Sequence, residues 1–472
     1  MIERRLAIVR EDCETCEEGP QYLLVWRLSL GDPQTGEAYV AFVDALEGGL
    51  MGYHNATMHL TGYVDAKVWL ESPGVGQTTQ DLAGMRYKRY NAQQQEIGTG
   101  YTGTNGSLYY TESTARVVAD LGRNFISQTG SRVKVNSGST TDDGLSNEIE
   151  YDAGVFSWVF PDDATSSGPD SVKQEEVNVY YHMDKFHRYW KLTHGFTKSQ
   201  VKAYVRSGSS VAASAYGDTV ISFGSSSAGD YAHPQHARDS DAIKHEYTHT
   251  VIHQIFGNSL GSLGCISSEN DSGAALDEGI PDFFAVSHNN FQNDTQVAEW
   301  IYGASHPSLR NLNNTRTISD FSSDSSKYKN SLLISGACWD LRKDPQVLQT
   351  KGEKIIFKAL LLMDLENWTC DQSPNPLGLS SFHDYLYEAD YQLYDDWDGL
   401  DNGTPHAPDI WDAFKEGSKD RNIPTTIYSS QPSRDGTPKL VAEHTAPLRA
   451  SARLGSGAVH LQHDGTVGAS VG

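Results

Sequence analysis

Two histidines and an acid at helical spacing form the part of this chain that is best suited to chemistry. His245 and His249 stand four residues apart, and Glu246 directly follows the first of them. Because an α-helix turns once every 3.6 residues, both imidazoles face the same side and can bind one ion. Glu246 points about 100° away around the helix, where it can reach a water on that ion. This His-Glu-x-x-His arrangement is typical of zinc hydrolases.

A third ligand for such an ion is predicted downstream, at Glu278. His253 lies on the same helical face, but at 1.5 Å per residue it is about 12 Å from His245, too far to share one tetrahedral ion. We interpret His253 as a packed or solvated histidine. Glu278 and Asp282 are four residues apart on a second predicted helix, so one carboxylate can bind the metal while the other accepts the ring N–H of a ligand histidine. A solvated pair of surface acids is the alternative at this spacing.

The helix that carries the histidines has recognisable ends. The acids and hydroxyl of residues 239–241 favour a helix start, and Gly257 suits its end. Two imidazoles and one carboxylate leave a fourth tetrahedral position open, which is typical of catalytic zinc. Zinc lowers the pKa of a water in that position from 15.7 towards roughly 7. Glu246 is then predicted to act as the general base, and later to protonate the departing amine.

The two motifs together resemble the gluzincin metallopeptidases, in particular the fungalysin group related to thermolysin. Similar segments are residues 178–187, 237–249, 277–284 and 335–342, and the resemblance spans residues 176–417. It implies an α+β zincin-like peptidase domain with a mostly helical C-terminal lobe. It also implies zinc bound by His245, His249 and Glu278, with Asp282 behind a ligand histidine.

The chain departs from this family at its transition-state histidine, whose place falls on Tyr328. A phenol can donate a hydrogen bond to a developing oxyanion, so we assign Tyr328 a catalytic role beside Glu246. A misalignment with the family at this position, or simple packing of the ring, is the alternative. In the family a strand edge binds the substrate backbone, and Ser214, Ala215 and Tyr216 are the nearest candidates for that edge.

The chain is organised as a multidomain protein. Residues 1–55 carry two alternating apolar segments around a Gly/Pro turn and resemble the end of a fungalysin pro-segment; a small complete β element is the alternative. Residues 56–165 are rich in short alternating runs and predict an all-β sandwich. Residues 166–420 form the predicted peptidase domain, and residues 421–472 read as a linker and the start of a possible further β module.

The composition limits the classes of binding partner that we expect. The 37 basic and 61 acidic residues give a formal charge of −24, so nucleic acid and anionic lipid surfaces are unfavourable partners. No apolar run is long enough to span a membrane. We expect a monomeric, secreted protein that acts on protein or peptide substrates. Its first residues lack the apolar core of a signal peptide, which alone would favour the cytosol. Because residues 1–55 resemble the end of a pro-segment, we expect instead that the natural start lies upstream.

Calcium is the second cation considered. Residues 395–403 are acidic enough for a calcium loop, but Leu400 interrupts the alternation of an EF-hand, so a solvated acidic loop is favoured. Of the five cysteines, Cys13 and Cys16 form one Cys-x-x-Cys pair. A zinc ribbon needs a second pair at matching spacing, which the sequence lacks.

The predicted function is a zinc-dependent endopeptidase. Two alternatives remain open. A catalytically degenerate binding or scaffold protein would explain Tyr328. A zinc aminopeptidase would share the downstream carboxylates, although no motif that anchors a free N-terminus is evident.

Overall fold

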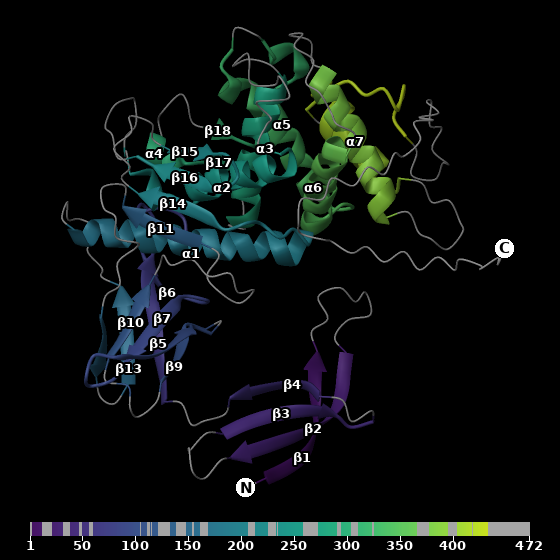
Figure 1. Cartoon of the computed structure of the whole chain (residues 1–472). Helices are drawn as coiled ribbons and strands as arrows, with labels where there is room; N and C mark the ends of the chain where they lie inside the picture. Colours follow the sequence, from purple (N-terminus) through teal and green to yellow (C-terminus); the bar gives the residue numbers. More distant parts are fainter. Residues whose placement is uncertain are drawn as a thin grey trace, which may run out of the picture.

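The computed structural model combines β-sheets in the first part of the chain with a helical second part (Figure 1). It describes residues 2–11, 21–31, 38–46, 50–55, 60–103, 105–110, 114, 116–120, 133–137, 148–152, 155–160, 169–205, 213–224, 233, 235–257, 272–289, 294–303, 310–322, 325–365, 377–394, 404–417 and 419–432. Within these ranges, no helix has both the length and the apolar character needed to cross a membrane.

An antiparallel sheet of four strands comes first. Its order follows the sequence: β1 (Ile2–Glu11), β2 (Gln21–Gly31), β3 (Ala38–Asp44) and β4 (Leu50–Asn55). The pairing of β2 with β3 confirms the predicted hairpin. Its identity as the end of a pro-segment stays a prediction.

Residues 60–160 are all-β where they are described, as predicted. Apart from the strand at Val133–Ser137, which belongs to another sheet, the strands are β5 (Leu60–Val68), β6 (Thr78–Asp81), β7 (Arg86–Tyr90), β8 (Glu96–Tyr101), β9 (Ser107–Tyr110), β10 (Arg116–Asp120), β12 (Glu148–Asp152) and β13 (Val155–Phe160). They form one connected sheet in the order β6-β5-β13-β12-β10-β7-β8, with β9 paired to β5. A sandwich of two separate sheets was expected. The connection arises because β12 pairs with both β10 and β13.

A mixed sheet lies beside the long helix α1 (Pro169–His194) and the metal-motif helix α2 (Ser240–Ile255) (Figure 1). Its order is β11 (Val133–Ser137), β14 (Val201–Val205), β16 (Val220–Phe223) and β15 (Ala213–Tyr216). The first three strands are parallel, whereas β15 is an antiparallel edge strand. This edge packs against α2, so the residues considered for substrate binding lie on a strand next to the histidine helix.

The rest of the described chain is mainly helical. It comprises α3 (Ser272–Asn289), β17 (Gln296–Val297), α4 (Glu299–Tyr302), β18 (Arg310–Asn311), η2 (Ile318–Asp320), α5 (Lys327–Lys343), α6 (Gln349–Leu365), α7 (Leu377–Tyr394), α8 (Ala407–Trp411) and η3 (Asp412–Glu416). Helix α3 packs on α2 and on α5. These elements match the expected helical C-terminal region, while a zincin-like fold as such stays a prediction.

One buried asparagine joins the β-sheet to the start of the histidine helix. Asn178 on α1 accepts the backbone N–H of Trp69 at 3.0 Å and donates to the carbonyl of Ala237 at 3.0 Å. The Ser240 backbone N–H also donates to the Glu71 carbonyl at 2.8 Å. Because buried polar groups are costly unless they are paired, this network fixes where α2 begins.

The start of α2 is capped as the sequence predicts. The Asp239 carboxylate accepts the backbone N–H groups of Asp241 at 3.0 Å and Ala242 at 3.1 Å. These bonds satisfy two of the donors that a helix start leaves free. Gly257, at φ +68°, ends the helix in the left-handed region that favours glycine. The histidine helix is therefore held at both ends and buried along almost its whole length.

Candidate metal centre

The two predicted histidines meet at one point. The Nε2 atoms of His245 and His249 are 3.1 Å apart, and both side chains are buried. The ring planes are nearly perpendicular, at 80°, with centroids 4.7 Å apart. One turn of α2 therefore directs two imidazole nitrogens at the same small volume.

Glu278 on α3 completes the group. Its Oε2 atom lies 3.2 Å from His245 Nε2 and 3.9 Å from His249 Nε2. This oxygen is buried and accepts no hydrogen bond from any part of the chain that the structure describes. Ligands of a tetrahedral zinc ion at 2.0–2.2 Å stand roughly 3.4 Å apart. The donor set and its spacing therefore fit one metal ion, and the three residues form a buried group able to hold it.

Two carboxylates lie behind the imidazoles. Asp282 Oδ1 is 2.8 Å from His245 Nδ1, which places the predicted residue at the far side of a ligand ring. Asp277 Oδ1 is 3.5 Å from His249 Nδ1. Asp277 was not predicted, although it directly precedes Glu278. Carboxylates in this position orient an imidazole so that its other nitrogen faces the ion.

The charges of the centre are strongly coupled. Burial alone would lower the pKa of His249, but the nearby carboxylates, with Asp277 foremost, raise it to about 9. Burial alone would raise the pKa of Glu278, yet the two imidazoles and the Lys327 ammonium hold it well below its usual range. The low pKa of Glu278 favours its anion, and the raised pKa of His249 favours a protonated ring. Because an imidazole must be neutral to bind a metal, a divalent cation would compete with a proton for His249.

The predicted general base lies on the same helix. Glu246 is buried, with 9% of its surface exposed. Its negative charge is among the groups that raise the pKa of His249, so its carboxylate lies within electrostatic reach of the ligand rings. The structure therefore places Glu246 beside the metal-binding group and outside the three ligands, as the helical spacing predicts.

Tyr328 lies at the start of α5, close to the centre. Partial burial, together with the charge of Glu278, raises the pKa of its phenol to about 12, so the hydroxyl keeps its proton at neutral pH. Two cations flank the ring: Arg310 at 5.4 Å and Lys327 at 5.0 Å from its centroid. The phenol is available as a donor, while its catalytic role stays a prediction.

Sequence patterns missed these two cations. Arg310 on β18 places Nη1 at 2.8 Å from Asp282 Oδ1, and its buried Nε has no hydrogen-bond acceptor among the described residues. Lys327 places Nζ at 2.6 Å from Glu278 Oε1. Neither residue has a fixed spacing from the His-Glu-x-x-His motif. Only the packing of β18 and α5 against α3 brings them to the centre.

The other histidines considered have structural roles. His182 contacts the Trp69 carbonyl at 2.7 Å, and His187 contacts the Tyr247 hydroxyl at 2.8 Å. His253 lies outside the three-residue group, as expected from its distance along the helix. The contacts of His182 and His187 hold α1 against Trp69 and α2, outside the centre.

A second group of carboxylates is formed by Glu71, Asp294 and Glu299. Burial, together with the charge of Asp241, raises the pKa of Glu299 to about 8. The acidic loop predicted at residues 395–403 lies outside the described part of the chain.

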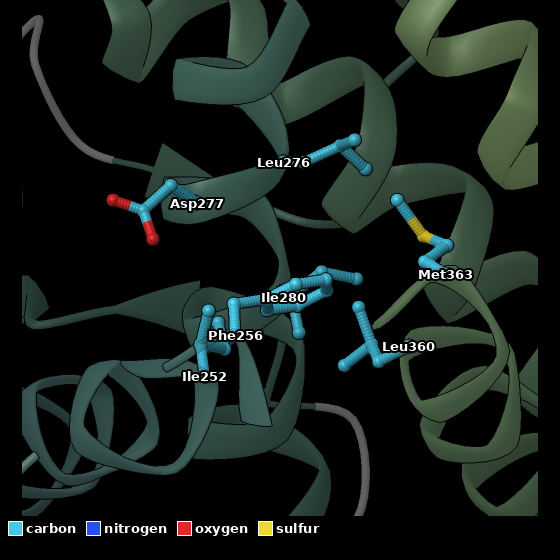
Figure 2. Close-up of a pocket in the computed structure, with 7 residues that line it drawn as sticks. All are labelled: Ile252, Phe256, Leu276, Asp277, Ile280, Leu360 and Met363. Atoms are coloured by element: carbon cyan, nitrogen blue, oxygen red, sulfur yellow. The ribbon is translucent and has the colours of Figure 1, made fainter. Parts of the chain in front are cut away.

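A small apolar pocket opens near the centre, between α2, α3 and α6 (Figure 2). Its lining is Ile252, Phe256, Leu276, Asp277, Ile280, Leu360 and Met363. The Asp277 carboxylate is directed away from the apolar side chains. The pocket therefore lies next to the two helices that carry His245, His249 and Glu278, and its wall is apolar.

Comparison with known protein families finds no family model that matches this chain, and comparison with curated proteins finds no relative. The resemblance to fungalysins accordingly stays a prediction that depends on the motifs.

Proposed function

We propose that this protein is a zinc-dependent endopeptidase. The observation that carries the proposal is the buried Oε2 of Glu278, which has no hydrogen-bond partner in the described chain and faces two imidazole nitrogens. His245, His249 and Glu278 would hold the ion. Two nitrogens and one oxygen match the ligand set of catalytic zinc, which keeps one position open. When bound, zinc would acidify a water and polarise a substrate carbonyl.

The residues around the ligands supply the remaining chemistry. Glu246 takes the proton of the attacking water and passes it to the departing amine. Asp282 and Asp277 keep the two imidazoles oriented through their Nδ1 atoms. The Tyr328 hydroxyl is a donor near the centre that can stabilise developing negative charge on the substrate carbonyl.

Substitution of Glu246 by glutamine tests the proposal. Glu246→Gln keeps the size of the side chain and leaves the three ligands intact, so bound zinc should be unchanged. Cleavage of a blocked internal peptide should fall by about 10²–10⁴-fold, the usual contribution of a positioned acid–base group. Glu388→Gln, at an exposed position on α7, is the matched control and should retain activity.

The outcomes separate the three candidate functions. Hydrolysis by Glu246→Gln at the rate of the unsubstituted chain would remove Glu246 from the mechanism. An unsubstituted protein that binds zinc but cleaves nothing would favour the binding or scaffold protein. Cleavage of free aminoacyl substrates without cleavage of blocked peptides would favour an aminopeptidase.

A further inference from the structure

The contact with Lys327 gives the two oxygens of the Glu278 carboxylate different surroundings. The ammonium lies 2.6 Å from Oε1, while Oε2 faces the two imidazoles and has no hydrogen-bond partner in the described chain. Arg310 Nη1 is 3.7 Å from Oε2, beyond ordinary hydrogen-bond length. One oxygen is therefore held by a cation of the protein, while the other faces the two imidazoles.

The fold holds Lys327 in this place. Gly279, the residue after Glu278, lies so close to α5 that an added Cβ would be 2.8 Å from the Ser331 carbonyl oxygen. Lys327 is four residues before Ser331, so both lie on the same face of α5. The close approach of the two helices therefore fixes the start of α5 against the metal-binding carboxylate. Only about one third of the Lys327 side chain is exposed, and 5% of the Glu278 side chain.

We propose that Lys327 is a positioning residue that holds Glu278 Oε1, so that Glu278 offers a metal ion only Oε2. This inference rests on the proposed metal centre. A carboxylate can bind a cation through one oxygen or both, and a zinc site can expand from four to five ligands. An ammonium on Oε1 restricts Glu278 to one oxygen. It also offsets one negative charge beside the centre.

Cobalt spectroscopy tests the role of Lys327 without requiring hydrolysis. The probe is Co²⁺ bound in place of zinc, because its visible absorption is strong in a four-coordinate site and weaker when a fifth ligand joins. Lys327→Met keeps an unbranched side chain as long as the carbon part of lysine but removes the ammonium. We expect Lys327→Met to lose intensity as Oε1 approaches the ion, and Lys327→Arg to keep the spectrum of the unsubstituted protein.

Lys329→Met is the matched control, since it removes the same charge from an exposed position two residues along α5. It should leave the cobalt spectrum unchanged. Circular dichroism of the three variants checks that each is folded, and Lys327→Arg shows whether a cation at this position is sufficient.

The outcomes separate this inference from the proposed function. A Lys327→Met spectrum identical to that of the unsubstituted protein would overturn the role of Lys327. The absence of any cobalt spectrum in the unsubstituted protein would overturn both the centre and the inference. A cobalt spectrum that weakens in Lys327→Met, in a protein that hydrolyses no peptide, would support the inference and reject the endopeptidase.

Discussion

At the scale of single residues, each of the three side chains in the candidate metal centre has a second partner that fixes its direction. His245 has Asp282 behind its ring, His249 has Asp277, and Glu278 has Lys327 on its outer oxygen. Such partners remove alternative rotamers before an ion arrives, so less ordering is required on binding. The preorganisation is local, because all of these contacts involve α2, α3 and the first residue of α5.

The buried imidazole of His383, on α7, leads to a prediction about how stability depends on pH. His383 is fully buried, with its Nδ1 atom 3.1 Å from the Ile423 carbonyl and its Nε2 atom 3.1 Å from the Tyr387 hydroxyl. Burial, aided by Lys415, lowers its pKa from 6.5 to about 4. The neutral ring therefore contributes stability that is fully present above pH 6.5 and is lost as the pH falls towards 4.

The expected size is about 3 kcal/mol of unfolding free energy across this window. His383→Gln should remove that part of the pH dependence, as measured by chemical denaturation between pH 7 and 4. His233→Gln, at an exposed position, should keep it. Parallel curves for His383→Gln and the unsubstituted protein would show that His383 is not protonated on unfolding in this range.

Helical spacing predicted the residues of the centre that lie on one turn of a helix. His245 and His249 are related by one turn, as are Glu278 and Asp282, and the structure places all four together. Arg310 and Lys327 escaped prediction because their contacts depend on how β18 and α5 pack. The spacing of residues within one segment does not predict how that segment packs against another.

At the scale of elements, the distance between α3 and α5 controls the centre. Gly279 on α3 faces the Ser331 carbonyl and the side chain of Ile334, and an added Cβ would be 2.8 Å from the first and 3.0 Å from the second. Gly279→Ala must therefore push the helices apart, because a backbone carbonyl cannot turn aside as a flexible side chain can.

We expect Gly279→Ala to lower the free energy of unfolding by about 1–3 kcal/mol, the usual cost of overpacking. It should also lower the visible absorption of the cobalt-loaded protein, because Lys327 moves with α5 and no longer holds Glu278 Oε1. Denaturation and the cobalt spectrum measure the two effects. Gly74→Ala, whose added Cβ meets nothing nearer than 3.6 Å, is the control, and equal stability of the two variants would contradict the close-packing account.

The ends of α2 were predictable because capping is local. Asp239 and Gly257 act through bonds and dihedral angles within a few residues. The connected eight-stranded sheet was not, since strand order depends on partners far apart in the chain. β5 pairs with β13, for instance, across almost one hundred residues.

At the scale of the whole molecule, the sheet region and the part that carries α1 and α2 are joined at a buried junction. Asn178 bridges Trp69 of the sheet region to Ala237 ahead of α2, and Arg238 pairs with Glu175 at 2.8 Å. The boundary expected near residue 165 therefore separates segments that share contacts at the start of the metal-motif helix. The sheet supports α2 directly, which gives this region a part in positioning the centre.

The central claim is that His245, His249 and Glu278 converge on a single divalent ion. Diffraction from crystals of the zinc-loaded protein, recorded on both sides of the zinc absorption edge, tests it most directly. We predict one anomalous peak per chain at this position, within about 2.0–2.2 Å of both Nε2 atoms and of Glu278 Oε2. A peak that leaves Glu278 unligated, or no peak among the three side chains, would contradict the account.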